Sequence, residues 1–253
     1  MANASGMLEK SAQIKFEDFV TLTSQEKSAE GLYKSLIEAV SQHGFDRVIF
    51  SITNDCDLAP QTNGIGVFHN YPEDWHAYYL ENEFHRFDPV LRYASQRVGA
   101  FKWSDIEDSS HLTSKQKKCL RLGEEAGLHN GVGVPLRGKK SQLAGIALAT
   151  SEKKNACEEN IDLINAYCNQ FYIAYKRLLT PPEKIDAAIY LSKREEEILS
   201  WAAMGKTDEE IAIILGISRN TVDTHMRHIF GKLDVNSKIL AVVKALTYGL
   251  ISY

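Results

Sequence analysis

Capping residues mark two helix starts in the last sixty residues of the chain. These capping signals constrain the fold more than any other feature. Ser192 is followed three residues later by Glu195, and Thr207 is followed by Glu210 at the same spacing. In such a pair, a capping box, each side chain satisfies a backbone amide at the start of a helix. The pattern predicts two short helices with a break at Gly205.

Further capping and turn residues predict two more helices after these. A glycine-containing turn ends the second helix, and Ser218 can cap a third that runs to about Leu233. Asn236 can cap a fourth, which ends near Gly249. Residues 191–253 are therefore expected to form an all-α domain of four helices.

The third helix has two distinct faces. Its inward stripe is Val222, His225, Met226, Ile229 and Leu233. Its opposite stripe carries hydrogen-bonding side chains at helical spacing, namely Asn220, Asp223, Thr224 and Arg227. A polar face is usually only a solvated face. A short helix, a tight turn and a polar-faced helix, however, are also the parts that place one helix in the major groove of DNA.

The distribution of charge favours the DNA-binding interpretation. The whole chain has a net charge of −4, which by itself would discourage binding to nucleic acid. Residues 191–215 contain three basic and six acidic side chains, whereas residues 216–253 contain five basic and two acidic ones. The local basic excess falls on the segment that carries the polar-faced helix.

A series of residues along this domain matches a known one. They are Leu191–Glu195, Trp201, Gly205–Thr207, Glu210–Ala212, Leu215, Ile217–Ser218, Thr221–Val222, His225, Lys232–Leu233 and Gly249–Ile251. The series resembles the LuxR-type helix-turn-helix domain over its whole length. The resemblance implies that Thr221–Lys232 is the recognition helix and that the fourth helix mediates dimerisation. His228 and Lys238 depart from the family, which usually has asparagine and arginine there.

The resemblance also implies a set of DNA contacts. Asp223 is unusual among them, because a carboxylate near phosphates must accept from cytosine N4 or pair with Arg227 or Arg219. Candidate phosphate contacts are Lys206, Thr207 and Arg219, and candidate base contacts are Asn220, Asp223, Thr224 and Arg227. Thr221 and Lys232 complete the set of candidate DNA-binding residues.

The remaining chain predicts a separate α+β domain over residues 1–178, with a linker over residues 179–190. Pro181 and Pro182 end the helical pattern before them and mark the boundary. We expect an α/β/α sandwich with a mostly antiparallel five-stranded sheet. The expected elements are a helix over Leu32–Val40 ending at Gly44, strands Phe45–Thr53, Gly64–His69, Gly131–Leu136 and Gln142–Thr150, a hairpin turn Gly138–Ser141, a helix beginning at Pro72, and a helix Glu158–Leu178.

Aromatic and acidic residues are spaced along this domain in a second recognisable order. Tyr71-Pro72-x-x-Trp75-x-x-x-Tyr79 is followed by Asp88-Pro89, Trp103 and Gly131. This order resembles the autoinducer-binding domain of quorum-sensing LuxR regulators across residues 16–178. The resemblance implies an N-acyl-homoserine lactone as ligand and a dimerising domain. The rival interpretation is that Asp88-Pro89 starts a helix and that the aromatic residues are ordinary core.

The chemistry of such a ligand suggests a role for each residue. Trp75 can donate to the lactone carbonyl, Asp88 can accept from the amide and Tyr71 can donate to the acyl carbonyl. Tyr79 and Trp103 would form aromatic walls. Ala147 stands where family members often have serine or threonine, and Ser51 or Thr53 could supply the hydroxyl. Small residues at Gly133, Gly145 and Ala147, beside Leu143, suggest a roomy cavity for a long, branched or aryl acyl group.

Several function classes are not expected. The cysteines, Cys56, Cys119, Cys157 and Cys168, have neither paired spacing nor nearby histidines, so neither a metal site nor a cofactor is expected. There is no apolar run of membrane-spanning length, which predicts a cytoplasmic protein without a membrane partner. The sequence contains neither a nucleophile elbow nor an H-E-x-x-H motif, so an enzyme is not expected.

The sequence thus predicts a ligand-responsive transcriptional regulator. As a homodimer it would bind a two-fold symmetric double-stranded DNA operator and contact RNA polymerase, with activation the expected mode and repression left open. The alternative is a dimerising antagonist of related regulators that does not bind DNA productively. The exposed polar stripe of the third helix argues against that alternative.

Overall fold

The computed structural model describes residues 14–55, 58–107, 111–138, 142–153, 160–180 and 189–252. The chain forms two compact units, and the main division along the sequence lies between Thr180 and Pro181. The expected hairpin residues 139–141, the linker residues 181–188 and both Cys56 and Cys157 lie outside the described residues. None of the helices in the described part of the chain is long and apolar enough to cross a membrane.

The first unit is built on a five-stranded sheet with the strand order β2-β1-β5-β4-β3. β1 pairs antiparallel with β2, and β3 pairs antiparallel with β4. The register of the β1–β2 pair shifts between Phe50 and Ile52, which marks an irregularity beside Ser51. The strands are β1 (Arg47–Asn54), β2 (Gly64–His69), β3 (Phe101–Lys102), β4 (His129–Arg137) and β5 (Leu143–Thr150).

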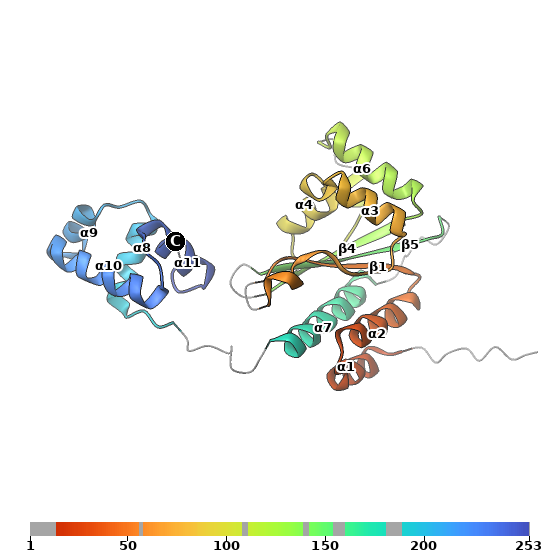
Figure 1. Ribbon diagram of the computed structural model, residues 1–253, viewed down its shortest axis with the longest axis horizontal. Helices are drawn as coiled ribbons and strands as arrows, with labels where there is room; N and C mark the ends of the chain where they lie inside the picture. The colour runs from red at the N-terminus through yellow and green to blue at the C-terminus, as the bar shows by residue number, and fades with distance from the viewer. Residues whose placement is uncertain are drawn as a thin grey trace, which may run out of the picture. The chain divides into compact units, whose positions relative to one another are not determined.

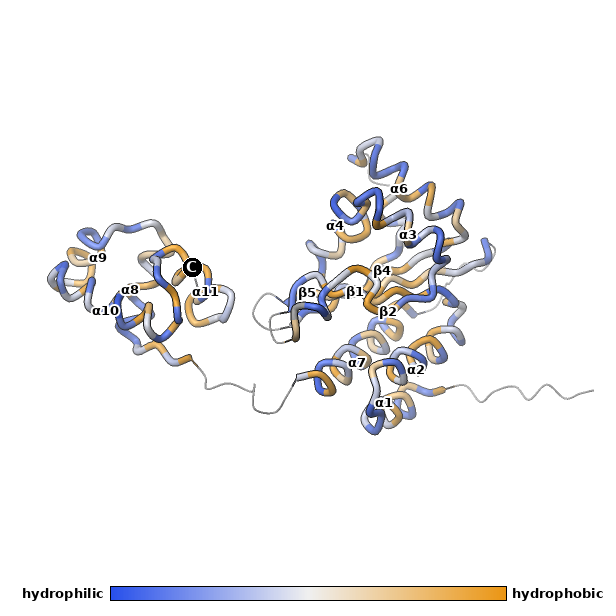
Figure 2. Tube along the Cα trace, viewed as in Figure 1, coloured by the Kyte–Doolittle hydropathy of each residue, from blue (hydrophilic) through white to orange (hydrophobic). Residues whose placement is uncertain are grey.

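Helices cover both faces of this sheet, so the expected α/β/α sandwich is confirmed (Figure 1). One layer contains α1 (Phe16–Gln25), α2 (Ala29–Ser41) and α7 (Ile161–Leu179). The other contains α3 (Glu73–Glu81), α4 (Pro89–Gln96) and α6 (Ser114–Glu125), and a short α5 (Ser104–Glu107) follows β3. Figure 2 shows apolar stretches along the strands and mixed polar and apolar residues along the helices, as expected for helices that cover a sheet.

The two faces of the sheet are used differently. Val48, Phe50 and Ile52 of β1 lie in the main core, where they pack with residues of α1, α2 and α7. Ile49 points to the opposite face and packs with Tyr71 and other residues of smaller clusters there. The alternation along β1 that the sequence predicted is therefore confirmed.

The second unit is all helical, as predicted. It contains α8 (Lys193–Ala203), α9 (Asp208–Leu215), α10 (Arg219–Leu233) and α11 (Lys238–Thr247). Both capping boxes form, because Ser192 and Thr207 accept from the amides of Glu195 and Glu210, whose side chains accept in return. Leu191, Ile198, Leu199, Ile211, Val222, Met226, Ile229, Leu233, Ala241 and Ala245 form its buried core.

The expected cap of the fourth helix is wrong by one residue. The side chain that accepts from the amide of Leu240 is that of Ser237, not Asn236, so α11 starts one position later. Both residues are good helix caps, and the chain places the hydroxyl of Ser237 at the cap position. The first strand also begins later than expected, at Arg47 rather than Phe45.

Candidate functional site

A cavity lies in the first unit between the sheet and the layer of helices α3, α4 and α6. Its volume is about 100 Å³. Seven of the predicted ligand-binding residues line it: Ser51, Tyr71, Trp75, Tyr79, Asp88, Trp103 and Ala147. The structure therefore brings together residues that are up to 96 positions apart in the sequence, while Pro89 and Gly131 are not among the residues that line the cavity.

Asp88 is half-buried and supplies the carboxylate of the cavity. Its Oδ1 accepts from the amide of Val90 at 2.7 Å, so Asp88 caps α4 and Pro89 occupies the first turn of that helix. Its Oδ2 accepts from the hydroxyl of Tyr79 at 2.7 Å. Burial raises the pKa of Asp88 above its ordinary value, although these hydrogen bonds oppose the shift. Helix cap and cavity acceptor are therefore compatible roles for one carboxylate.

Two tyrosines place their hydroxyl groups in the same apolar region. Tyr71 donates to the carbonyl oxygen of Ala147 at 3.3 Å, which is long for a hydroxyl donor and leaves it able to turn to another acceptor. Burial, and then the charge of Asp88, raises the pKa of both Tyr71 and Tyr79. Both hydroxyls consequently remain protonated donors.

Trp103 closes one side of the cavity, and its position depends on Gly131. A Cβ atom on Gly131 would lie 2.0 Å from Cδ2 of Trp103, so only glycine leaves room for the indole. The indole Nε1 of Trp103 is buried and has no hydrogen-bond partner among the described residues. A buried N–H without a partner is costly unless a ligand or water accepts from it. Trp103, which the sequence suggested only as a wall, is thus also a candidate donor.

The small residues of the sheet do not all leave empty volume, which corrects the expectation of a roomy cavity at Gly133. A Cβ atom there would lie 2.3 Å from Cζ of Phe101, so the Phe101 ring already occupies that space. Gly145 does border open space, since its nearest neighbour would be the carbonyl oxygen of Val134 at 3.6 Å. Ser51 accepts from the amide of Gly66 at 3.0 Å and can still donate its own proton.

A second, wider cavity of about 430 Å³ shares part of its lining with the first. Ser51, Asp88 and Gly145 line both cavities. Its far end is bordered by exposed residues, among them Arg86 and Arg92. Thr53, the other predicted hydroxyl, borders only this second cavity. A ligand anchored near Asp88 could therefore extend a long chain toward the surface.

Several lining residues were missed by the sequence analysis. Cys119, Leu120 and Gly123 come from α6, a helix that the analysis did not predict. Its start was detectable, because Thr113 and Gln116 form a capping box of the same kind as the two recognised in the second unit. His76 also lines the cavity, one residue after Trp75, and no sequence signal marked it.

The predicted base-reading stripe lies on the surface of α10. Asn220, Thr224 and Arg227 are exposed, whereas Val222, Met226 and Ile229 are buried on the other side of the helix. Asp223 is paired with Arg227 one turn later, which is one of the two outcomes expected for its carboxylate. Thr221 is also exposed and lies beside the cap residue Ser218 at the start of the helix.

The predicted phosphate contacts differ in their availability. Arg219 is exposed and Lys206 is partly exposed, and they pair with Glu209 at 3.0 Å and Glu210 at 3.3 Å, so both can exchange these partners for a phosphate. Thr207 caps α9. Lys232 is held more firmly, because its ammonium lies 2.6 Å from Oε2 of the buried Glu195. A phosphate contact by Lys232 would have to compete with that ion pair.

Two family models together match most of the chain. An autoinducer binding domain matches residues 28–172, and a domain described as bacterial regulatory proteins, luxR family, matches residues 190–245. A similar protein is the HTH-type quorum sensing-dependent transcriptional regulator RpaR of Rhodopseudomonas palustris. It is 34% identical over 72% of this chain and 73% of its own length. The transcriptional activator protein AnoR of Acinetobacter nosocomialis is 26% identical over 93% of this chain and 98% of its own.

Solved structures show the same architecture. SdiA of Escherichia coli superposes with a TM-score of 0.62 at 26% identity, over 94% of this chain and 98% of that one. A structure of SdiA in complex with octanoyl-rac-glycerol has a TM-score of 0.61 at 25% identity, over 93% and 94% of the two chains. The likeness thus extends over both units of the chain.

Proposed function

Because the chain belongs to the luxR family of bacterial regulatory proteins, as a quorum-sensing transcriptional regulator with an autoinducer-binding and a helix-turn-helix domain, we propose that its ligand is an N-acyl-homoserine lactone. The family consists of transcriptional regulators and not of enzymes. Binding of the ligand in the first unit would favour a dimer that engages a two-fold symmetric operator in the cytoplasm and contacts RNA polymerase.

The arrangement around Asp88 carries this proposal. An apolar cavity there contains one carboxylate acceptor, the hydroxyl of Tyr71 and the unpartnered indole N–H of Trp103. Trp75 also lines the cavity, so its indole is a second candidate donor. An acyl-homoserine lactone presents one amide donor and two carbonyl acceptors on an apolar body, which complements such a set. The complex of SdiA with octanoyl-rac-glycerol shows that a related protein accommodates an acyl chain.

Two surfaces of the second unit support DNA binding as a dimer. The base-reading stripe of α10 is exposed and free to enter a major groove. On α11, Ile239, Leu240 and Val243 are exposed apolar residues, with 76%, 49% and 54% of their surface accessible. An apolar helix face of this kind is suited to a symmetric helix–helix contact between two copies.

Ligand binding is tested by thermal unfolding of the full-length protein with a series of acyl-homoserine lactones. We expect long-chain members to raise the melting temperature most, because the second cavity can receive the chain. A ligand at 100 times its dissociation constant adds about 2.7 kcal/mol to the free energy of unfolding. Homoserine lactone without an acyl chain is the control. Stabilisation by the shortest chains alone would contradict the proposed long-chain preference.

DNA binding is tested by a gel-shift titration at several salt concentrations. Replacing Arg219 with alanine should weaken binding to all DNA sequences similarly and reduce the magnitude of the salt slope by about 1, because one phosphate contact is lost. Arg121→Ala is the matched control, since Arg121 is also an exposed, ion-paired arginine but belongs to the first unit. An unchanged slope would remove Arg219 from the contacts. Absence of specific binding with any ligand would favour the dimerising antagonist.

A further inference from the structure

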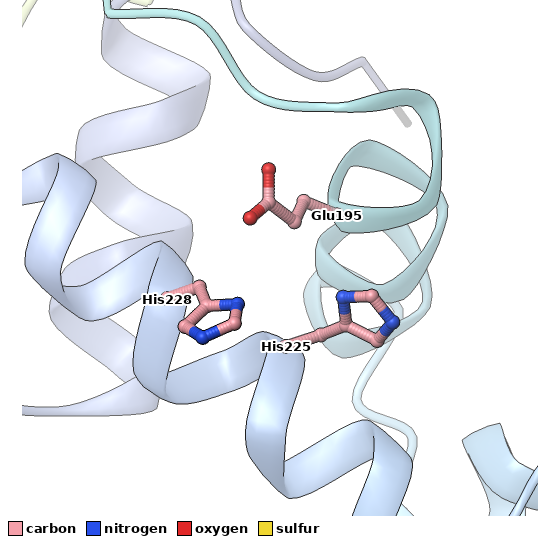
Figure 3. A group of neighbouring side chains, drawn as sticks. All are labelled: Glu195, His225 and His228. Carbon is pink, nitrogen blue, oxygen red and sulfur yellow. The ribbon is translucent and has the colours of Figure 1, made fainter.

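Three potential metal ligands meet between α8 and α10 of the second unit. Glu195 comes from the first turn of α8, and His225 and His228 lie three residues apart on α10 (Figure 3). One ligand atom from each residue lies within 4.8 Å of the other two. Residues at this helical spacing project on the same side of a helix, and such pairs serve as metal ligands in helical proteins.

The three residues differ in their exposure, so one side of the cluster is buried and the other is accessible to solvent. Glu195 is 3% exposed, His225 is half-buried and His228 is exposed. Oε2 of Glu195 accepts from the amide of Ser192 at 2.7 Å and from Nζ of Lys232 at 2.6 Å. The carboxylate is therefore held in place while a solvent path to the histidines remains.

The chemistry of the three side chains suits a cation. The carboxylate of Glu195 is already paired with a cation, because Nζ of Lys232 lies 2.6 Å from its Oε2. The anionic oxygen faces two nitrogen donors of the kind that zinc prefers.

We propose that Glu195, His225 and His228 form a binding site for a divalent transition-metal ion of the zinc type, with water completing the coordination. Two histidines and one carboxylate are an established donor set for zinc. Bond lengths of about 2.0–2.2 Å in a tetrahedral site place neighbouring ligand atoms roughly 3.4 Å apart. The three donors, which lie within 4.8 Å of one another, would have to move closer together to reach that spacing.

The site would act as a clamp between two helices of the DNA-binding unit. A bound ion would tie the start of α8 to the middle of α10, and it would compete with Lys232 for the carboxylate of Glu195. Lys232 would then be released toward solvent. This consequence rests on the proposed function, because the released ammonium and the added charge lie on the helix that we propose reads DNA.

Metal binding is tested on the untagged full-length protein by calorimetric titration with Zn²⁺ and by the visible spectrum of added Co²⁺. We expect one saturable site for each chain and the intense visible bands of four-coordinate cobalt. His228→Asn and His225→Gln should each weaken Zn²⁺ binding about tenfold or more, because each removes one of three protein ligands. His111→Asn is the matched control, since His111 is an exposed histidine outside the cluster.

A Lys232→Gln variant separates the clamp from a merely structural cluster. If the ion displaces Lys232 from Glu195, this variant should bind Zn²⁺ more tightly than the wild type. The site is overturned if Zn²⁺ does not bind, or if His228→Asn and His225→Gln, shown to be folded by circular dichroism, bind it as tightly as the wild type. DNA binding is measured separately, by a gel shift with and without Zn²⁺. If the protein does not bind DNA, the calorimetric and spectroscopic tests of the metal site are still valid.

Discussion

Replacing Asp88 with asparagine is expected to weaken ligand binding by about ten- to a hundredfold while leaving the start of α4 in place. The Oδ1 atom of asparagine can still accept from the amide of Val90, as Asp88 does. The other oxygen, Oδ2, is replaced by an NH₂ group. This group is a donor and cannot accept a hydrogen bond from the amide of the proposed ligand. Loss of a hydrogen bond to a charged group costs roughly 1.5–3 kcal/mol, which corresponds to that change in affinity.

The change is measured by calorimetric titration with the lactone that stabilises the wild type best. Asp74→Asn is the matched control, because Asp74 is an exposed aspartate on the neighbouring helix α3. Equal affinities for the wild type and the Asp88→Asn variant would show that the carboxylate does not accept from the ligand. The cap can be checked separately, since helix content should be unchanged in both variants.

The same variant has a second readout in the dependence of stability on pH. Burial raises the pKa of Asp88 above its ordinary value of 3.8, so the folded protein binds this proton more tightly than the unfolded chain does. The stabilisation from protonated Asp88 is complete below 3.8 and is lost as the pH rises through the folded pKa. Relative to Asp88→Asn, the wild type should therefore lose free energy of unfolding as the pH rises through that window.

Local patterns predicted the elements whose periodicity is regular. The alternation along β1 identified both faces of the sheet, because a strand places successive side chains on opposite sides. The capping boxes at Ser192 and Thr207 located two helices of the second unit to the residue. Helix α6 was missed despite its capping box at Thr113, because most of its residues are charged or polar and few apolar side chains mark its buried face.

The cavity could be predicted only in part, because its size depends on side chains that are distant in sequence. The order of Tyr71, Trp75 and Asp88 pointed to the correct region. No local pattern, however, shows that Phe101 fills the space beside Gly133. The cluster of Glu195 with His225 and His228 could not be predicted either, because its residues come from two different helices and form no short sequence motif.

Gly131 is expected to be the least replaceable glycine of the first unit. In Gly131→Ala the new methyl group would lie 2.0 Å from Cδ2 of Trp103 and 2.2 Å from its Cε2, so the indole must move. Overpacking of this kind costs about 1–3 kcal/mol of stability. Because Trp103 lines the cavity, the displaced ring should also weaken ligand binding. Denaturant unfolding and ligand titration of the full-length protein measure the two effects.

Two further variants test whether the clash with Trp103 causes the loss of stability in Gly131→Ala. In Gly145→Ala the new methyl group would meet its nearest neighbour at 3.6 Å, an ordinary contact, so its stability should change little although Gly145 lines the same cavity. In a Trp103→Ala background, Gly131→Ala should lose most of its effect, because the ring it displaces is absent. If the substitution remains equally destabilising there, glycine is required by the backbone of β4 and not by the space that the Trp103 indole occupies.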